Sequence, residues 1–150
     1  MMQTNRSVPS DVLVAHIVYR DVAEAMAWLT RAFGFAEHFR YGDPDQPNGA
    51  QMRFRDAVFM IVEVRPGRAT PADSGVHTQN LTVFTEDVDA HYARAKAAGA
   101  KIIEEPHETE YGEYQYAAKD FAGHLWIFAR HARDMSPEKW GATMAQPPKF

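Results

Sequence analysis

The chain contains no cysteine among its 150 residues. Disulfide bonds, thiolate nucleophiles and zinc–thiolate sites are therefore all excluded. The chain also lacks an apolar run of about 18 residues, the length that a membrane-spanning helix requires, and its first residues lead into no apolar signal segment. We therefore expect a cytoplasmic protein that has no membrane partner.

Basic residues are too few and too scattered to bind a phosphate backbone. The chain has 16 basic and 20 acidic residues and a net charge of -4, with no basic cluster. Nucleic acid is therefore not an expected partner. With 45% hydrophobic and 24% charged residues, the composition is that of a soluble globular protein with one ordinary core.

The first half of the chain alternates between strand and helix signals. Residues 12–19 are rich in β-branched and apolar side chains, which predicts a strand. Asp21 then offers a capping carboxylate, an amphipathic stripe starts at Val22, and Gly34 supplies a left-handed stop. Three candidate strands follow, at 35–41, 50–55 and 58–64.

The second half repeats this order. A strand is predicted at 79–85, and a helix begins after Asp87 and ends at Gly99. Asp87 lies 66 residues after Asp21, and Gly99 lies 65 residues after Gly34. Three strands are again expected, at 101–104, 114–119 and 125–130. The nearly constant offset indicates an internal duplication.

We therefore predict an α+β fold of two tandem βαβββ modules within one domain, residues 10–145. Ser136 before Pro137 resembles the start of a helix, which predicts a short C-terminal helix. The expected boundaries are 10–65 for module one, 66–75 for the linker, 76–130 for module two and 136–145 for the C-terminal helix.

Several segments together resemble a known family. They are 19–22, 32–35, 86–89, 97–100 and, most strongly, Lys-Asp-Phe-Ala-Gly-His-Leu-Trp at 119–126. In order and spacing they resemble the vicinal oxygen chelate superfamily of glyoxalase, bleomycin-resistance and extradiol-dioxygenase proteins. The continuation at 136–138 is similar to its PhnB-like branch. The resemblance implies a glyoxalase/bleomycin-resistance-like fold of paired βαβββ modules, assembled as a homodimer.

The resemblance also implies where a metal would bind. Enzymes of this family hold a divalent ion with His, Gln and Glu side chains, and the corresponding positions here are Val14, Met60, Asn80 and Ile127. None of the four is a His, a Gln or a carboxylate, whereas a catalytic ion needs about three protein ligands. We therefore expect no metal cofactor.

His16 is the residue that favours a metal site against this expectation. It lies two residues beyond Val14 and so projects from the same face of its strand. If a metal binds at all, His16 is the candidate ligand. Glu63 and His77 are the other candidates, but alternation along their strands places both on the wrong face.

Strand alternation also predicts which side chains face the pocket. Tyr111, Tyr114 and Tyr116 lie near the last hairpin, where they either stack a planar or cationic ligand or merely fill the pleated surface. The pocket residues expected from the other strands are Val14, His16, Val18, Thr78, Asn80, Thr82, Leu125 and Ile127.

These residues favour a protein that binds a small organic ligand without a metal and so sequesters a drug or a metabolite. The first alternative is a divalent-metal-dependent lyase, isomerase or dioxygenase-type enzyme that uses His16. The second is a metal-free enzyme with His16 as general base. The sequence does not identify the ligand, and it does not show whether the modules pair within one chain or between two chains. It also leaves open whether any reaction is catalysed.

Overall fold

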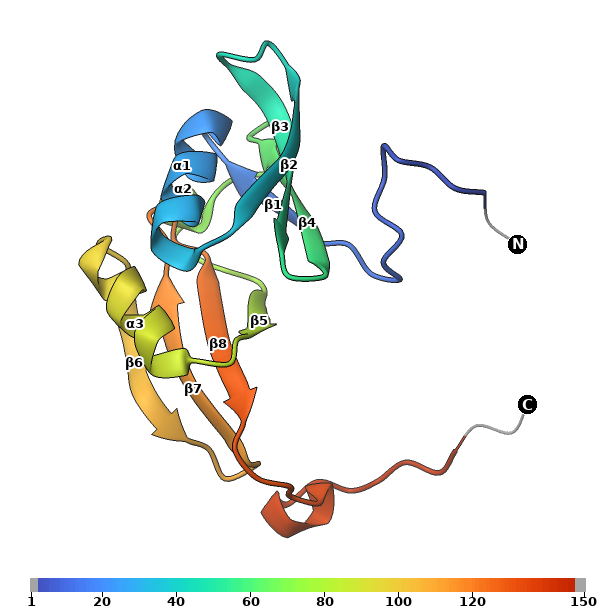
Figure 1. Cartoon of the computed structure of the whole chain (residues 1–150), viewed down its shortest axis with the longest axis vertical. Coiled ribbons are helices and arrows are strands. Elements are labelled where there is room, and N and C mark those ends of the chain that lie inside the picture. The colour runs from blue at the N-terminus through green and yellow to red at the C-terminus, as the bar shows by residue number, and fades with distance from the viewer. Residues whose placement is uncertain (1–2, 148–150) are drawn as a thin grey trace.

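A computed structural model describes residues 3–147 and contains two modules built in the same order (Figure 1). The first module comprises β1 (His16–Tyr19), α1 (Val22–Phe33), β2 (Ala36–Gly42), β3 (Pro47–Phe54) and β4 (Ala57–Glu63). The second comprises β5 (Asn80–Phe84), α3 (Val88–Ala97), β6 (Lys101–Glu108), β7 (Glu113–Lys119) and β8 (Leu125–His131). The short helix α2 (Pro71–Ser74) lies between the modules.

Each module folds into a four-stranded sheet with the same topology. The strand orders are β1-β4-β3-β2, called sheet one, and β5-β8-β7-β6, called sheet two. In both sheets the first and last strands of the module pair in parallel, and the other pairs are antiparallel. The prediction of an α+β fold with two tandem βαβββ modules is confirmed. Among residues 3–147, no helix is long and apolar enough to cross a membrane.

Both long helices begin as their sequences predict. The Asp21 carboxylate accepts a hydrogen bond from the Glu24 amide, and the Asp87 carboxylate accepts one from the Ala90 amide. These bonds satisfy amide groups that have no partner within the helix. Gly34 ends α1 with a φ of 75°, in the left-handed region that glycine adopts without steric cost.

Several element boundaries differ from the prediction because pairing partners decide them. β1 begins at His16, since Val12 and Leu13 are exposed and pair with no neighbouring strand. β6 continues to Glu108 because β7 pairs with it along this length. The expected linker at 66–75 contains α2, which begins where the Thr70 hydroxyl accepts a hydrogen bond from the Asp73 amide.

The short C-terminal helix expected at 136–145 is present as a single 3-10 turn, Pro137–Trp140, which Gly141 ends with a φ of 103°. The turn begins after Ser136 as predicted, but the Ser136 side chain makes no capping hydrogen bond. Trp140 instead packs beside Tyr111, with ring centroids 5.7 Å apart.

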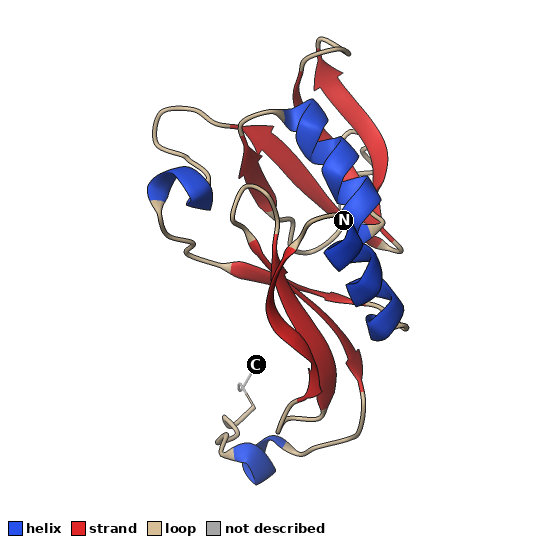
Figure 2. Cartoon of the chain, turned by 90° about the vertical axis from the view of Figure 1, so that its left-hand side faces the viewer, coloured by secondary structure: helices blue, strands red, loops and turns tan. Residues whose placement is uncertain are grey.

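The two modules share one aromatic core. Helices α1 and α3 lie side by side on the same side of the molecule, in front of the sheets in Figure 2. Beneath them, Phe33 and Phe35 of module one contact Trp126 and Phe128 of module two, at centroid distances between 4.7 and 6.2 Å. Burial of such large side chains from both modules stabilises their mutual placement.

A buried carboxylate also joins the modules. Asp120, which is 5% exposed, accepts hydrogen bonds from the Tyr19 hydroxyl at 2.6 Å and the Trp126 indole at 3.0 Å. It also accepts bonds at 3.0 Å from the backbone amides of Ala122 and His124. Burial and the neighbouring Asp120 charge raise the pKa of Tyr19 well above its usual value, so its hydroxyl remains a donor.

A second connection lies between the helices. One ring nitrogen of His91 on α3 contacts the Phe33 carbonyl at 2.9 Å and must donate to it, while the other contacts the Tyr116 hydroxyl at 2.5 Å. A neutral imidazole satisfies both contacts, donating to the carbonyl and accepting from the hydroxyl. Burial and the nearby Arg94 charge lower the pKa of His91. Arg94 itself donates to the carbonyls of Thr30 and Arg31 at the end of α1.

We expect Tyr19→Phe to lower the free energy of unfolding by about 1–3 kcal/mol, because the Asp120 carboxylate loses a charge-assisted hydrogen bond in a buried site. Urea unfolding followed by circular dichroism measures this change. Tyr111→Phe is the matched control, because Tyr111 is exposed and its hydroxyl makes only a 3.5 Å contact, with Gln115. This substitution should change stability by less than about 0.5 kcal/mol. Equal effects of the two substitutions would contradict the role of Asp120.

We expect a pH-dependent loss of stability from His91. Because its pKa in the folded state is lowered, the unfolded chain binds more protons below the ordinary histidine value of about 6.5. The stabilising contribution is complete above that pH and is lost as the pH falls through the lower, folded-state pKa. Urea midpoints measured between about pH 7.5 and 5 should therefore fall more steeply for the native chain than for His91→Gln. Parallel pH profiles would show that His91 is not responsible.

Candidate functional site

Each sheet has a face that the helices leave open. In β1, Ile17 and Tyr19 point into the core, whereas His16 and Val18 point to the opposite face. In β5, Asn80 and Thr82 are exposed in the same alternating way. In Figure 1, α1 and α3 lie on the left of the sheets, and neither helix covers the opposite faces. We call these surfaces the open face of sheet one and the open face of sheet two.

The open face of sheet two carries a groove with an apolar floor. Thr82 pairs in register with Ile127, and Asn80 pairs with Leu125, so these expected pocket residues of module two share one face. The groove has a volume of about 530 Å³. Its floor is formed by Ile103, Ala117, Leu125 and Ile127, and its rim by Glu104, His107, Glu108, Thr109, Glu110, Tyr111 and Gln115.

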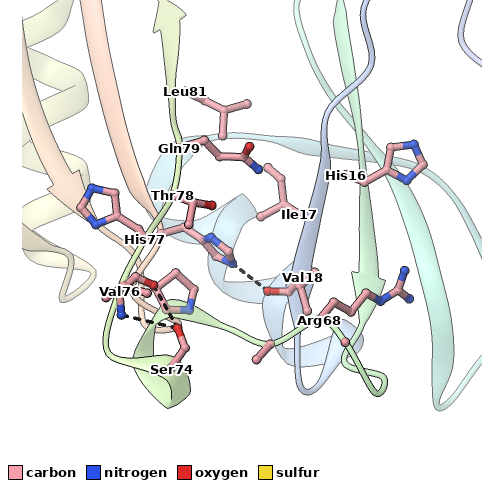
Figure 3. Close-up of a pocket in the computed structure, with 14 residues that line it drawn as sticks. His16, Ile17, Val18, Arg68, Ser74, Val76, His77, Thr78, Gln79 and Leu81 are labelled. Atoms are coloured by element: carbon pink, nitrogen blue, oxygen red, sulfur yellow. Dashed lines mark hydrogen bonds between the residues drawn. The ribbon is translucent and has the colours of Figure 1, made fainter.

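A second cavity, of about 400 Å³, lies where the edge of β1 approaches β5 and the segment that precedes it (Figure 3). His16 and Val18 line it from sheet one, and Thr78 and Leu81 line it from module two. His124 holds the two sides together, because its side chain donates to the Val18 carbonyl at 2.7 Å. Of these residues His16, Val18 and Thr78 were expected to face the pocket, and Leu81 was not.

The two cavities differ in charge. Among residues 3–147, the groove on sheet two is lined by three glutamates and by no lysine or arginine. The cavity at β1 is lined by Arg68 and three histidines, and no carboxylate of the described residues lines it. The charge that lines each cavity favours a ligand, or a protein surface, of the opposite charge.

A row of side chains crosses the open face of sheet one. His16 pairs in register with Met60, and Met60 pairs with Gln51. The Gln51 side-chain nitrogen lies 3.7 Å from the Met60 sulfur, and its oxygen lies 2.5 Å from a ring nitrogen of His38 on β2. The row therefore runs from β1 to β2 with one side chain from each strand.

Comparison with known proteins now identifies the family. Residues 12–128 match the model of the Glyoxalase/Bleomycin resistance protein/Dioxygenase superfamily, which covers both modules. The chain belongs to this superfamily.

Solved structures share this fold, and curated relatives share sequence with most of the chain. TioX from Micromonospora sp. ML1 is 32% identical, with 81% of this chain and 99% of TioX covered and a TM-score of 0.68. An Arabidopsis thaliana gene product is 24% identical, with 82% and 100% of the two chains covered and a TM-score of 0.64. An uncharacterized Mycobacterium tuberculosis protein is 27% identical over 139 residues, which cover 89% of this chain and 82% of the relative.

The residues at the superfamily's expected metal positions do not form a fitting donor set. Met60 lies on the open face of sheet one beside His16, while Asn80 and Ile127 lie on sheet two. Val14 precedes β1 and is half-buried. Across residues 3–147, no three His, Cys, Asp or Glu side chains come together as a metal site would need. Within this part of the chain, His16 therefore belongs to no group of three such side chains.

The structure corrects the placement of two tyrosines. Tyr114 and Tyr116 point toward α3, not into the pocket: the Tyr114 hydroxyl donates to Asp89, and Tyr116 is fully buried against His91. Of the two alternatives drawn from the sequence, filling of the pleated surface applies to both. Tyr111 differs, because it lines the groove on sheet two.

Three polar side chains on or beside the open face of sheet one were not predicted from the sequence. Gln51 interrupts an otherwise apolar part of β3, and its parity relative to buried Ala50 and Met52 could have placed it on the open face. His38 escapes such counting because β2 contains a bulge between Glu37 and Phe39. Arg68 lies outside both sheets, so no periodicity could have placed it.

Proposed function

We propose that this protein binds a small organic molecule between its open sheet faces without a metal, as a drug- or metabolite-sequestering protein does. The observation that carries this proposal is the groove on sheet two, whose apolar floor at Leu125 and Ile127 is bordered by polar groups. Ligand sites usually combine an apolar lining with a few polar groups, in volumes between about 300 and 1,000 Å³. The groove and the cavity at β1 both have volumes of this size.

The arrangement of polar groups supports binding more than catalysis. General acid–base chemistry needs a proton-transferring side chain together with a second group that orients it or the substrate. The side chain of His16 has Met60 and Val18 as neighbours on its face, and neither of them can orient an imidazole. Asn80 and Thr82 can hydrogen-bond a ligand, and they carry no titratable group.

We further propose that two chains assemble as a homodimer through these faces. Large apolar side chains remain exposed there, among them Tyr41, Phe84 and Ile103. The carboxylate-lined groove of sheet two and the carboxylate-free cavity at sheet one are complementary in charge. An open face that meets its counterpart in a second chain would enclose the bound molecule and exclude water from it.

We expect ligand binding to raise the melting temperature, and Thr82→Arg to abolish this effect. A compound present at a hundredfold excess over its dissociation constant stabilises the folded state by about 2.7 kcal/mol. A thermal-shift screen of planar cationic, neutral and anionic compounds identifies the ligand. Because Thr82 is exposed beside Ile127, an arginine there obstructs the groove and leaves the core intact.

Thr143→Arg serves as the control, since it adds the same charge at an exposed position in the C-terminal tail. Elemental analysis of the purified protein and thermal shifts with Ni(II), Zn(II), Mn(II) and Mg(II) complete the test. Stoichiometric metal that is lost in His16→Ala would overturn metal-free binding and favour the metal-dependent enzyme.

Sedimentation equilibrium measures the oligomeric state, and a monomer at all concentrations would contradict the proposed dimer.

A further inference from the structure

The cavity at β1 carries cationic and imidazole donors where it borders the open face of sheet one, and among residues 3–147 no carboxylate lines it. His16 and Val18 of β1 lie on this side, and Arg68 lies beside β1, outside the sheet. In a protein with 20 acidic and 16 basic residues, such a surface departs from the average charge. Figure 3 shows His16 and Arg68 extending to the same side of β1, away from Gln79 and Thr78.

Arg68 is held in place with its charge uncompensated. Its Nε donates to the Glu63 carbonyl at 2.8 Å, which fixes the orientation of the half-buried guanidinium group. Neither terminal nitrogen has an acceptor within bonding distance among residues 3–147. By contrast, the neighbouring Arg65 faces the Glu63 carboxylate at 3.8 Å. A guanidinium fixed at Nε presents its remaining donors in a planar arrangement that matches an oxyanion.

Gln51 supplies an independent indication of a ligand. This side chain is 2% exposed, and its amide oxygen is already paired with His38. Its amide nitrogen meets only the Met60 sulfur, at 3.7 Å, and a thioether is a weak acceptor. A buried amide donor without an oxygen or nitrogen acceptor is costly, so an oxygen atom of a ligand over Met60 would complete its hydrogen bonding.

We propose that the open face of sheet one holds the oxyanion of an organic acid. Arg68 and His16 bind the anionic group beside β1, and Gln51 donates to a further oxygen of the same molecule over Met60. This inference rests on the proposed function and specifies the ligand class: an organic carboxylate or phosphate with its apolar part free to extend toward sheet two. The two anions share the chemistry that Arg68 recognises, and the experiment distinguishes them.

Four aromatic probes of similar size test the inference. Benzoate and phenyl phosphate are the anions, and benzylamine and benzyl alcohol are the matched cation and neutral compound. Binding to the full chain is measured by isothermal titration calorimetry at low and high salt. We expect the anions to bind and the other two not to, with affinity that falls at high salt because screening weakens the contact with Arg68. The stronger of the two anions identifies the preferred headgroup.

Arg68→Met keeps the apolar stem and removes the guanidinium, and it should weaken anion binding by roughly tenfold or more. Arg65→Met is the matched control, because it removes the same charge from the same segment and should leave the affinity within about twofold. Gln51→Met should also weaken binding, while melting curves of all variants verify folding.

The outcomes separate this inference from the proposed function. If the cation or the neutral probe binds as well as the anions, or if Arg68→Met binds benzoate and phenyl phosphate unchanged, the inference is wrong while small-molecule binding stands. If no compound in either this set or the broader thermal-shift screen binds, both fail. Anion binding that Arg65→Met leaves intact and Arg68→Met removes would place the anion beside β1, as proposed.

Discussion

The relative placement of the two modules depends on a buried carboxylate that forms no ion pair within residues 3–147. Asp120 is stabilised by four hydrogen-bond donors instead, two from backbone amides of its own hairpin and two from Tyr19 and Trp126. Because Tyr19 belongs to β1 and Asp120 to module two, this cluster fixes the edge of one sheet against the other. Removing any donor leaves a buried charge less well satisfied, which is a large cost in a site of low polarity.

The cavity at β1 is a direct consequence of this connection. His124, four residues after Asp120, donates to the Val18 carbonyl and so holds β1 at the position where it borders the cavity. On the other side of the molecule, His91 and Arg94 tie α3 to the end of α1. Hydrogen bonds and the shared aromatic core thus hold both modules in one arrangement and leave the open faces available.

The two open faces have different chemistry although the modules have the same topology. Sheet one presents His16 and Gln51, with Arg68 beside β1, and all three can donate hydrogen bonds, whereas sheet two presents an apolar floor with glutamates at its rim. Duplication of a module conserves backbone pairing, which depends on alternation and turns, but it does not constrain residues on a face that contributes little to the core. The two faces were therefore free to diverge in their chemistry.

Local interactions explain why much of the fold could be predicted from the sequence. The aspartate caps, the stop at Gly34 and the alternation of strands act over a few residues, so the sequence alone determined the two modules and their order. The same alternation explains why His16 and Thr82 are exposed while Ile17 of β1 is buried. Only the tertiary structure decided that Tyr116 is buried, that a bulge turns His38 toward Gln51, and that Arg68 lies beside β1. Those outcomes depend on contacts between segments far apart in the chain, which no local pattern encodes.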